Sequence, residues 1–285
     1  MRKYRFIEEK FFRILMFAAT LFIAIALVLI IVSILVKGLP ALTWEILSQT
    51  PKGGFFLGRE GGILNAIIGS IYLSIGATLL ALAFSLPLAL FMNVYLTRHR
   101  EFVNVIRYFL DILWGVPSIV YGAFGFTIMI LFGMSASLLA GIITVTLLII
   151  PIMTRAMDEV FKMAPTGLLE ASLSLGATRS ETAYSVFLKQ CFPGVITAIL
   201  LSFGRAIGDI AAVLFTTGFT DHIPTSLFHP TATLPLSIFF QLSSPIPEVQ
   251  DRAYVSALVL TSFILIISML TRLSSRRSQK NKVNF

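Results

Sequence analysis

Charged side chains are the scarcest component of this sequence. Aspartate, glutamate, lysine and arginine make up 13% of the 285 residues, about half of the roughly 25% found in soluble domains. The few charges gather in short stretches that alternate with long uncharged runs, so the chain is expected to cross a lipid bilayer several times. A net charge of +8 could indicate a nucleic-acid partner. Beside so apolar a background it is better explained by loops kept on the cytoplasmic side, and no nucleic acid is expected.

Cysteine and histidine are almost as scarce. The single cysteine, Cys191, excludes an internal disulfide and a cysteine-rich metal site, and we interpret it as a small apolar filler. His99, His222 and His229 are scattered along the chain. A surface metal site of Asp221, His222 and His229 is conceivable, but solvated loop residues are favoured because no known ligand spacing is met. No metal is therefore expected.

Three motifs that carry chemistry are also missing. The sequence has no G-x-x-x-x-G-K-S/T phosphate loop, no H-E-x-x-H and no G-x-S-x-G. We therefore expect no catalytic residue, no cofactor and no ATP binding through such a loop. The chain is not expected to be an enzyme on its own.

The uncharged runs predict an all-α integral membrane protein with six transmembrane helices. The first run, 14–36, is longer than the ~7–15-residue core of a cleavable signal, so it is expected to be a permanent helix. The run 112–154 exceeds one crossing of ~20 residues and divides at 133–137, which predicts two helices in a tight hairpin. The other helices are expected at 63 to about 97, with a bend at Pro87, and at 195–219 and 253–271.

Lysine and arginine predict the orientation of these helices. Seventeen of them fall in the N-terminus, the turn 98–107, the loop 155–189 and the tail, whereas only Lys37, Lys52, Arg59 and Arg252 fall on the opposite side. Because cytoplasmic loops are enriched in these residues, both termini are expected in the cytoplasm, in a multi-pass protein of the plasma (inner) membrane. The expected divisions are a cytoplasmic N-terminus (1–13), a first helix (14–36), an outer loop (37–62), a transmembrane domain (63–272) and a cytoplasmic tail (273–285).

A second long outer segment, 220–252, is rich in proline. Its apolar piece 234–242 is too short to span a bilayer. We expect this piece to lie at the outer surface or to dip back as a lid.

The cytoplasmic loop between the fourth and fifth helices has the pattern of a short helix, a turn and a new helix. Gly176 can end the first helix, and Thr178 to Glu181 has capping-box spacing for the second. Four leucines can line one side of the first helix: Leu168, Leu169, Leu173 and Leu175. Exposed apolar side chains there would dock a protein partner, but the loop could equally fold back on its own bundle.

Two charges interrupt the expected fifth helix. An arginine in hydrocarbon costs at least ~2.5–3.5 kcal/mol, so Arg205 must be paired or face an aqueous path. Asp209 is four residues away, on the same helix face, and can pair with it. A purely structural ion pair is one interpretation. Gly208 between them, however, favours a ligand or close helix approach, and a cation at membrane depth suits an anionic substrate.

The cytoplasmic loop also carries a resemblance. Glu170-Ala171, then Gly176, with Val186-x-Leu188 ten residues later, resembles the Glu-Ala-Ala loop of importer permeases of the ATP-binding-cassette class. In that family the loop is a coupling helix that docks in a groove of the ATPase, which assigns Glu170, Ala171 and Gly176 to ATPase coupling. Two positions depart from the pattern: Ser172 replaces the second alanine, and Lys189 stands where proline is common.

Further patches are similar to A-type permeases of phosphate-specific importers, and they follow one another in the same order over roughly residues 37 to 272. These patches are 38–69, 111–122, 204–216 and 233–238. Asp209 departs from that family, which usually has glutamate there.

The resemblance implies a full transport system. Its parts are a C-type sister permease, an ATPase dimer on the cytoplasmic face, an outer phosphate-binding protein and inorganic phosphate as substrate. Arg205 would partly neutralise the phosphate, and Asp209 would hold the guanidinium and keep binding weak. Three alternatives remain open: a permease for another oxyanion such as molybdate or sulfate, an ATP-independent channel or secondary transporter, and a regulatory scaffold.

Overall fold

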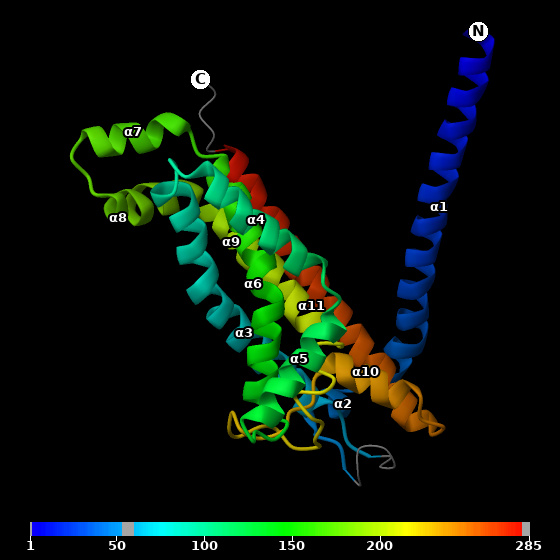
Figure 1. Cartoon of the computed structure of the whole chain (residues 1–285). Coiled ribbons are helices and arrows are strands. Elements are labelled where there is room, and N and C mark those ends of the chain that lie inside the picture. Colours follow the sequence, from blue (N-terminus) through cyan, green and yellow to red (C-terminus); the bar gives the residue numbers. More distant parts are fainter. Residues whose placement is uncertain (1, 53–59, 281–285) are drawn as a thin grey trace.

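The computed structural model describes residues 2–52 and 60–280. Arg59 and Lys282, which entered the charge distribution above, lie outside these residues. Within the described part the regular secondary structure is helical, and an isolated bridge between Lys52 and Glu60 stands in place of any strand. The elements (Figure 1) are α1 Arg2–Ala41, α2 Trp44–Ser48, α3 Leu64–Leu90, the π-helix η1 Phe91–Tyr95, α4 Arg100–Gly115, α5 Ser118–Leu131, α6 Leu138–Lys162, α7 Thr166–Ser174, α8 Arg179–Glu181, the π-helix η2 Thr182–Phe187, α9 Leu188–Gly208, α10 Leu234–Leu242 and α11 Pro247–Lys280.

The helices confirm a membrane-spanning all-α fold. Five are long and apolar enough to cross a bilayer, and a sixth crossing is formed if the bent pair α4 and α5 is counted as one. The five are Glu8–Ala41, Leu64–Tyr95, Leu138–Lys162, Arg179–Gly208 and Pro247–Leu273. The hairpin turn near residue 133 is also confirmed, since α5 ends at Leu131, α6 begins at Leu138 and Gly133 has φ +63°.

The third crossing differs from the straight helix expected from residue 112. Its first half, α4, begins at Arg100, and the chain bends by 95° between α4 and α5. Val116 at the bend is extended, with φ −70° and ψ 129°, and Pro117 follows it. Proline lacks an N–H and disfavours helical geometry in the residue before it, so the helix has to break here.

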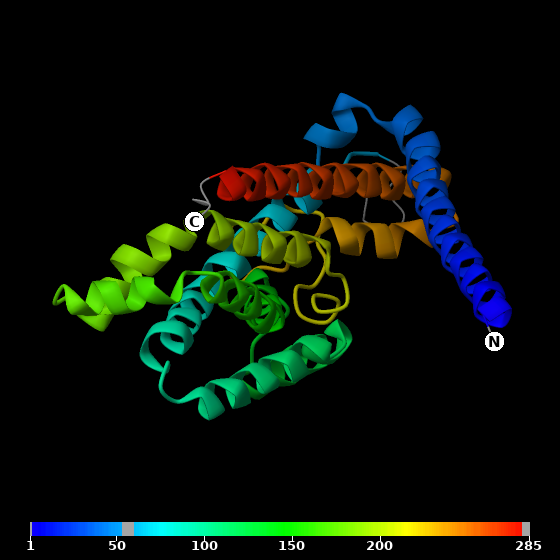
Figure 2. The ribbon, with the colours of Figure 1, turned by 90° about the horizontal axis from the view of Figure 1, so that it is seen from above.

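The first helix is longer than the uncharged run 14–36. It continues through Lys37 and Pro40 to Ala41, because the run marks how far the chain can lie in hydrocarbon and not where helical geometry ends. Most of α1 stands apart from the other helices (Figures 1 and 2). It meets the bundle at its C-terminal end, where the Lys37 ammonium donates to the Tyr254 hydroxyl of α11 over 2.9 Å.

The core lies between α3, α6 and α9. Small residues on α3 bring it close to α6: Ala77 and Ala81 are fully buried, and a Cβ added at Gly76 would lie 2.6 Å from Ile142 Cδ1. Close approach through small residues is the usual packing of helices in lipid, where lipid tails compete with apolar side chains. Met153 and Met157 of α6 fill the remaining space.

The fifth helix begins and ends earlier in the sequence than expected. The prediction of a helix over 195–219 was wrong at its C-terminal end, since α9 stops at Gly208. The chain after it, from 209 to 233, has no long helix, yet Ala212, Thr216 and Thr231 are fully buried. Its backbone groups bond to neighbouring segments, as when the Ser137 N–H donates to the Thr216 carbonyl over 2.9 Å. Irregular backbone survives at membrane depth only with such partners or beside a cavity.

The short apolar piece 234–242 forms α10. Thr233 caps it, and the Ser70 hydroxyl of α3 accepts a hydrogen bond from the Leu234 N–H over 2.8 Å. Leu234 and Leu236 are fully buried. The piece is therefore packed into the bundle through one face, beside α11 (Figure 1).

The ends of the bundle are distinct. The N-terminal end of α1, the C-terminal end of α11 and α7 all lie at the upper end in Figure 1, the α1 end well apart from the other two, and α2, α10 and the chain 209–233 lie towards the other end. This is the grouping of segments that the lysine and arginine distribution predicts.

Candidate functional sites

The helix–turn–helix at α7 and α8 is built as its sequence predicts. Gly176 closes α7 with φ +86°, a conformation that residues with a Cβ rarely adopt. Thr178 and Glu181 form the capping box: the Thr178 N–H donates to Glu181 Oε2 over 2.8 Å, and the Glu181 N–H donates to Thr178 Oγ1 over 3.2 Å. The turn is therefore held by its own side chains.

The two interpretations of this segment each describe one part of it. Leu168 and Leu169 pack against the core of the bundle, as expected of a loop that folds back. Leu175 is 89% exposed, and Glu170, Ala171 and Gly176 are exposed as well. The three residues assigned to coupling thus lie on a free surface next to an apolar side chain, which is a surface suited to a protein partner.

Ser172 stands where the Glu-Ala-Ala loop has its second alanine. It is buried, and its hydroxyl lies 2.9 Å from the equally buried Thr182 hydroxyl of η2. An alanine could not make this bond. The serine therefore helps to attach α7 to η2, and being buried it is not part of the exposed surface of α7.

Arg205 and Asp209 form the ion pair that their spacing predicts. Arg205 Nη2 lies 3.0 Å from Asp209 Oδ2, with the arginine side chain 49% exposed and the aspartate side chain 3% exposed. Asp209, however, is not in the helix. It is the C-cap of α9, with φ −81° and ψ 125°, and its Oδ1 accepts a hydrogen bond from the Ala212 N–H over 2.9 Å. One carboxylate thus binds the guanidinium and starts the next turn of the chain.

The pair lies beside the last span, away from both of its ends. A Cβ added at Gly204 would lie 3.7 Å from Ile267, and one at Gly208 would lie 3.8 Å from Ile264. Both isoleucines belong to the span Pro247–Leu273, and at ~1.5 Å per residue they lie at least ~25 Å along the helix from its first residue and at least ~9 Å from its last. A half-exposed cation therefore lies at membrane depth, at a helix end followed by irregular buried chain. Broken helices at membrane depth are a recurring feature of transporter binding sites.

A second charge cluster, at the α7 end of the bundle, was not anticipated. The fully buried Asp158 of α6 accepts from Arg107 Nε of α4 at 2.9 Å and from Arg155 Nη1 at 2.8 Å. Lys162 Nζ lies 3.1 Å from it, and Asn93 Nδ2 of η1 donates to it over 2.8 Å. The spacing of residues 155, 158 and 162 on one helix was a signal for part of this cluster. The partners from α4 and η1 are 51 and 65 residues away and left no local signal.

The irregular chain 209–233 holds a partly buried carboxylate beside its histidines. Asp221 Oδ1 is buried and has no hydrogen-bond partner among the described residues. Burial raises the pKa of the Asp221 carboxyl, and the neighbouring charges of His222 and Arg252 oppose that effect. The described residues contain no group of three histidine, cysteine, aspartate or glutamate side chains that could hold a metal ion.

The raised pKa predicts a pH dependence. Between the ordinary aspartate pKa of about 3.9 and the raised value, the folded state binds more protons than the unfolded state. The free energy of unfolding should therefore fall as pH rises through that window. Asp221→Asn should flatten this slope in thermal unfolding measured against pH. Asp251→Asn, at an exposed carboxylate in the same region of the chain, should leave the slope unchanged. Equal slopes in both variants would contradict the role of Asp221.

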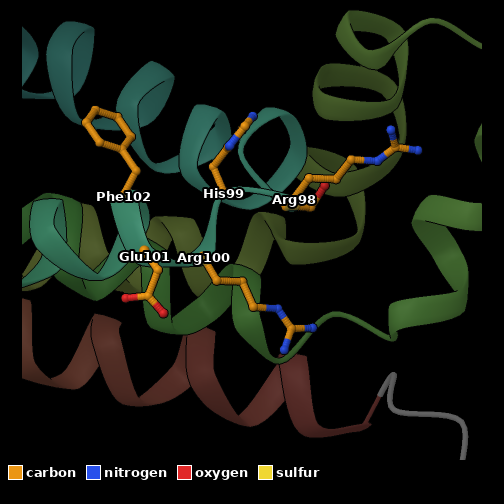
Figure 3. A pocket seen from close by; sticks show the side chains of 6 residues that line it. Arg98, His99, Arg100, Glu101 and Phe102 are labelled. Atoms are coloured by element: carbon orange, nitrogen blue, oxygen red, sulfur yellow. The ribbon is translucent and has the colours of Figure 1, made fainter.

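A surface hollow of about 560 Å³ lies at the turn between η1 and α4, lined by residues 97–102. Figure 3 shows Arg98, His99 and Arg100 pointing in different directions. The hollow therefore offers no converging set of donors for a ligand.

Comparison with known proteins agrees with this geometry. The fold is similar to that of a chain in inward-facing structures of the MetNI methionine ABC transporter, with a TM-score of 0.63, 16% identity and coverage of 76% of this chain and 95% of that one. A likeness at this identity concerns the fold alone. Residues 85–280 match the model of the binding-protein-dependent transport system inner membrane component. The chain belongs to this family, and it is a permease subunit of an ABC importer.

Two relatives match most of the length of the chain. Over 273 residues the chain is 30% identical to the phosphate transport system permease protein PstA of Pasteurella multocida, covering 94% of this chain and 95% of that protein. It is 32% identical to PstA of Yersinia pestis, covering 91% of this chain and 87% of that protein.

Proposed function

We propose that this permease imports inorganic phosphate, driven by ATP hydrolysis on a separate ATPase, and forms half of the translocation pathway. The observation that carries the proposal is the half-exposed Arg205 paired with Asp209 where α9 breaks. An exposed guanidinium is costly against lipid, so it has to face an aqueous path or a partner. The near full-length similarity to PstA permeases supports phosphate as the anion.

We assign the proposed partners to the following surfaces of the chain. A C-type sister permease supplies the other half of the pathway, opposite Arg205. An ATPase dimer docks on α7 through Glu170, Ala171 and Gly176, which are exposed beside Leu175. Both termini and α7 lie on the cytoplasmic side, and a phosphate-binding protein delivers its ligand at the other end, where α2 and the chain 209–233 lie (Figure 1).

The pair tunes transport through its charges. Arg205 partly neutralises the phosphate as it passes, and Asp209 competes for the same guanidinium. A site that bound phosphate too tightly would trap it, so the competing carboxylate favours release. ATP binding closes the ATPases, moves α7 and rocks the spans so that access to the pathway alternates.

Uptake experiments decide between this function and its alternatives. Assembled transporter in proteoliposomes should take up radiolabelled phosphate only with ATP, and excess molybdate or sulfate should not compete. Competition by either would favour another oxyanion. Uptake by this chain alone, without an ATPase, would favour a channel or secondary transporter.

The turn after α7 gives a matched pair of variants. A Cβ added at Gly167 or at Gly176 meets nothing within 4 Å, but only Gly176 has a positive φ. Gly176→Ala should therefore strain the turn by ~1–2 kcal/mol, misplace the coupling surface and weaken co-purification with the ATPase. Gly167→Ala should leave co-purification with the ATPase unchanged. Normal co-purification and ATP-coupled uptake with Gly176→Ala, or with a bulkier residue there or at Glu170, would refute the assignment of α7 as the coupling helix.

A further inference from the structure

The segment that carries the coupling surface bonds to another membrane span through one side chain. Arg179, the first residue of α8, donates from Nη1 to the carbonyl oxygens of Val94 at 3.0 Å and Tyr95 at 2.8 Å. These two residues are the last of η1, which continues α3. Among the described residues from 166 to 187, no other hydrogen bond reaches a different span.

The carbonyls that Arg179 binds are ones that need a donor. The last carbonyls of a helix have no partner within the helix, and a cation is favoured there by the helix dipole. A charged donor to such groups makes a stronger bond than a neutral one. Arg179 therefore stabilises the end of the α3 span from outside it.

Arg179 is itself tied to α7. It follows the left-handed turn at Gly176 directly after Thr178, and the capping box fixes its backbone. The buried hydroxyl pair of Ser172 and Thr182 joins α7 to η2 on the other side of the same turn. A shift of α7 therefore carries Arg179 with it.

The two π-helices leave room for such a shift. Between them lies an opening of about 520 Å³, lined by Pro87, Phe91 and Tyr95 on one side and by Ala183 and Tyr184 on the other. The buried side of η2 still packs through Ala183 in the same cluster as Leu90 and Val94, so the Arg179 bonds lie beside a hollow that is open at the surface. π-Helical turns are often found at functional sites.

The far side of η1 is anchored as well. Asn93 donates to Asp158 Oδ1 over 2.8 Å, and Arg107 of α4 donates to the same carboxylate. A displacement that reaches η1 therefore reaches the ends of α4 and α6 too. Because all these links are polar bonds with defined partners, one substitution can interrupt the chain of contacts at a known place.

We propose that Arg179 is the positioning residue through which movement of α7 is transmitted to the α3 span. This inference rests on the proposed function, since it assumes that an ATPase moves α7. The role is mechanical, and Arg179 touches neither phosphate nor ATP.

The test compares three variants in the assembled complex. Arg179→Met removes the donors and keeps an unbranched side chain, and Arg179→Lys keeps the charge and one donor group. Arg98→Met is the matched control, because Arg98 is exposed and has no hydrogen bond or ion pair among the described residues. Hydrogen–deuterium exchange of residues 91–99 and 164–176 is measured with and without ATP, a readout that needs the ATPase but no phosphate.

ATP should change exchange in both segments of the wild type and of Arg98→Met. In Arg179→Met the change in 91–99 should be lost while that in 164–176 persists, and phosphate taken up per ATP should fall roughly tenfold or more, since two hydrogen bonds from a charged donor are lost. For Arg179→Lys, both the exchange response of 91–99 and the phosphate taken up per ATP should lie between those of the wild type and of Arg179→Met. An Arg179→Met complex that responds like the wild type overturns the proposal, as does Arg179→Lys failing to assemble, which would indicate a structural role. A wild-type chain that binds no ATPase would refute the proposed function itself and the link with it.

Discussion

Replacing Arg205 with leucine should reduce phosphate uptake by the assembled transporter roughly 10- to 100-fold, the equivalent of the ~1.5–3 kcal/mol of a hydrogen bond to a charged group. The variant removes the cation at membrane depth and leaves the buried Asp209 carboxylate without its partner. An approaching anion then meets a negative charge alone. Arg205→Lys keeps the charge but not the planar guanidinium, so its phosphate uptake should lie between that of the wild type and that of Arg205→Leu.

A double variant separates the two causes of that loss. Asp209→Asn removes the charge and keeps an Oδ1 that can accept from the Ala212 N–H, so the turn should survive. If Arg205 acts on phosphate directly, Arg205→Leu with Asp209→Asn should remain impaired. Recovery of uptake in the double variant would assign the loss to the unpaired carboxylate. Normal uptake in Arg205→Leu alone would exclude Arg205 from the pathway.

Replacing Asp158 with alanine should destabilise the protein by ~3–5 kcal/mol, because it leaves the cations of Arg107, Arg155 and Lys162 without the buried carboxylate they share. Thermal unfolding in detergent should shift down by roughly 10 °C.

Glu159 provides the control for this prediction. It contacts Arg155 at 3.0 Å and Lys162 at 2.8 Å, but its side chain is 53% exposed. Glu159→Gln should cost at most ~1 kcal/mol, as surface ion pairs do. A similar shift in both variants would mean that burial of Asp158 is not what makes the cluster stabilising.

The features that the sequence predicted well depend on near neighbours. The Thr178 capping box and the pairing of Arg205 with Asp209 involve residues three and four positions apart, and their geometry follows from helix periodicity. The count of spans rests on uncharged runs, which measure fitness for hydrocarbon. An uncharged run does not indicate whether its backbone is helical. The predicted helix therefore ran on to Phe219, because the chain beyond Gly208 is also apolar and buried, whereas the helix itself ends at Gly208.

The features that escaped prediction depend on partners far along the chain. The ring of donors around Asp158 comes from three elements, and the bonds of Arg179 span 84 and 85 residues. In the sequence these residues read only as cytoplasmic cations or as unremarkable polar residues. The inward position of Ser172 likewise became visible only with Thr182 beside it. The bend between α4 and α5 did have a local signal in Pro117, which a count of uncharged residues does not register.

The double use of Asp209 has a consequence for how such a protein can change. The same carboxylate sets the charge beside Arg205 and fixes where the backbone turns after α9. A longer acidic side chain at this position could still reach the guanidinium, but it would have to give up the Ala212 N–H or shift the chain that follows. The charge beside Arg205 and the course of the chain after α9 are therefore coupled, so a substitution at this position that alters one should alter the other.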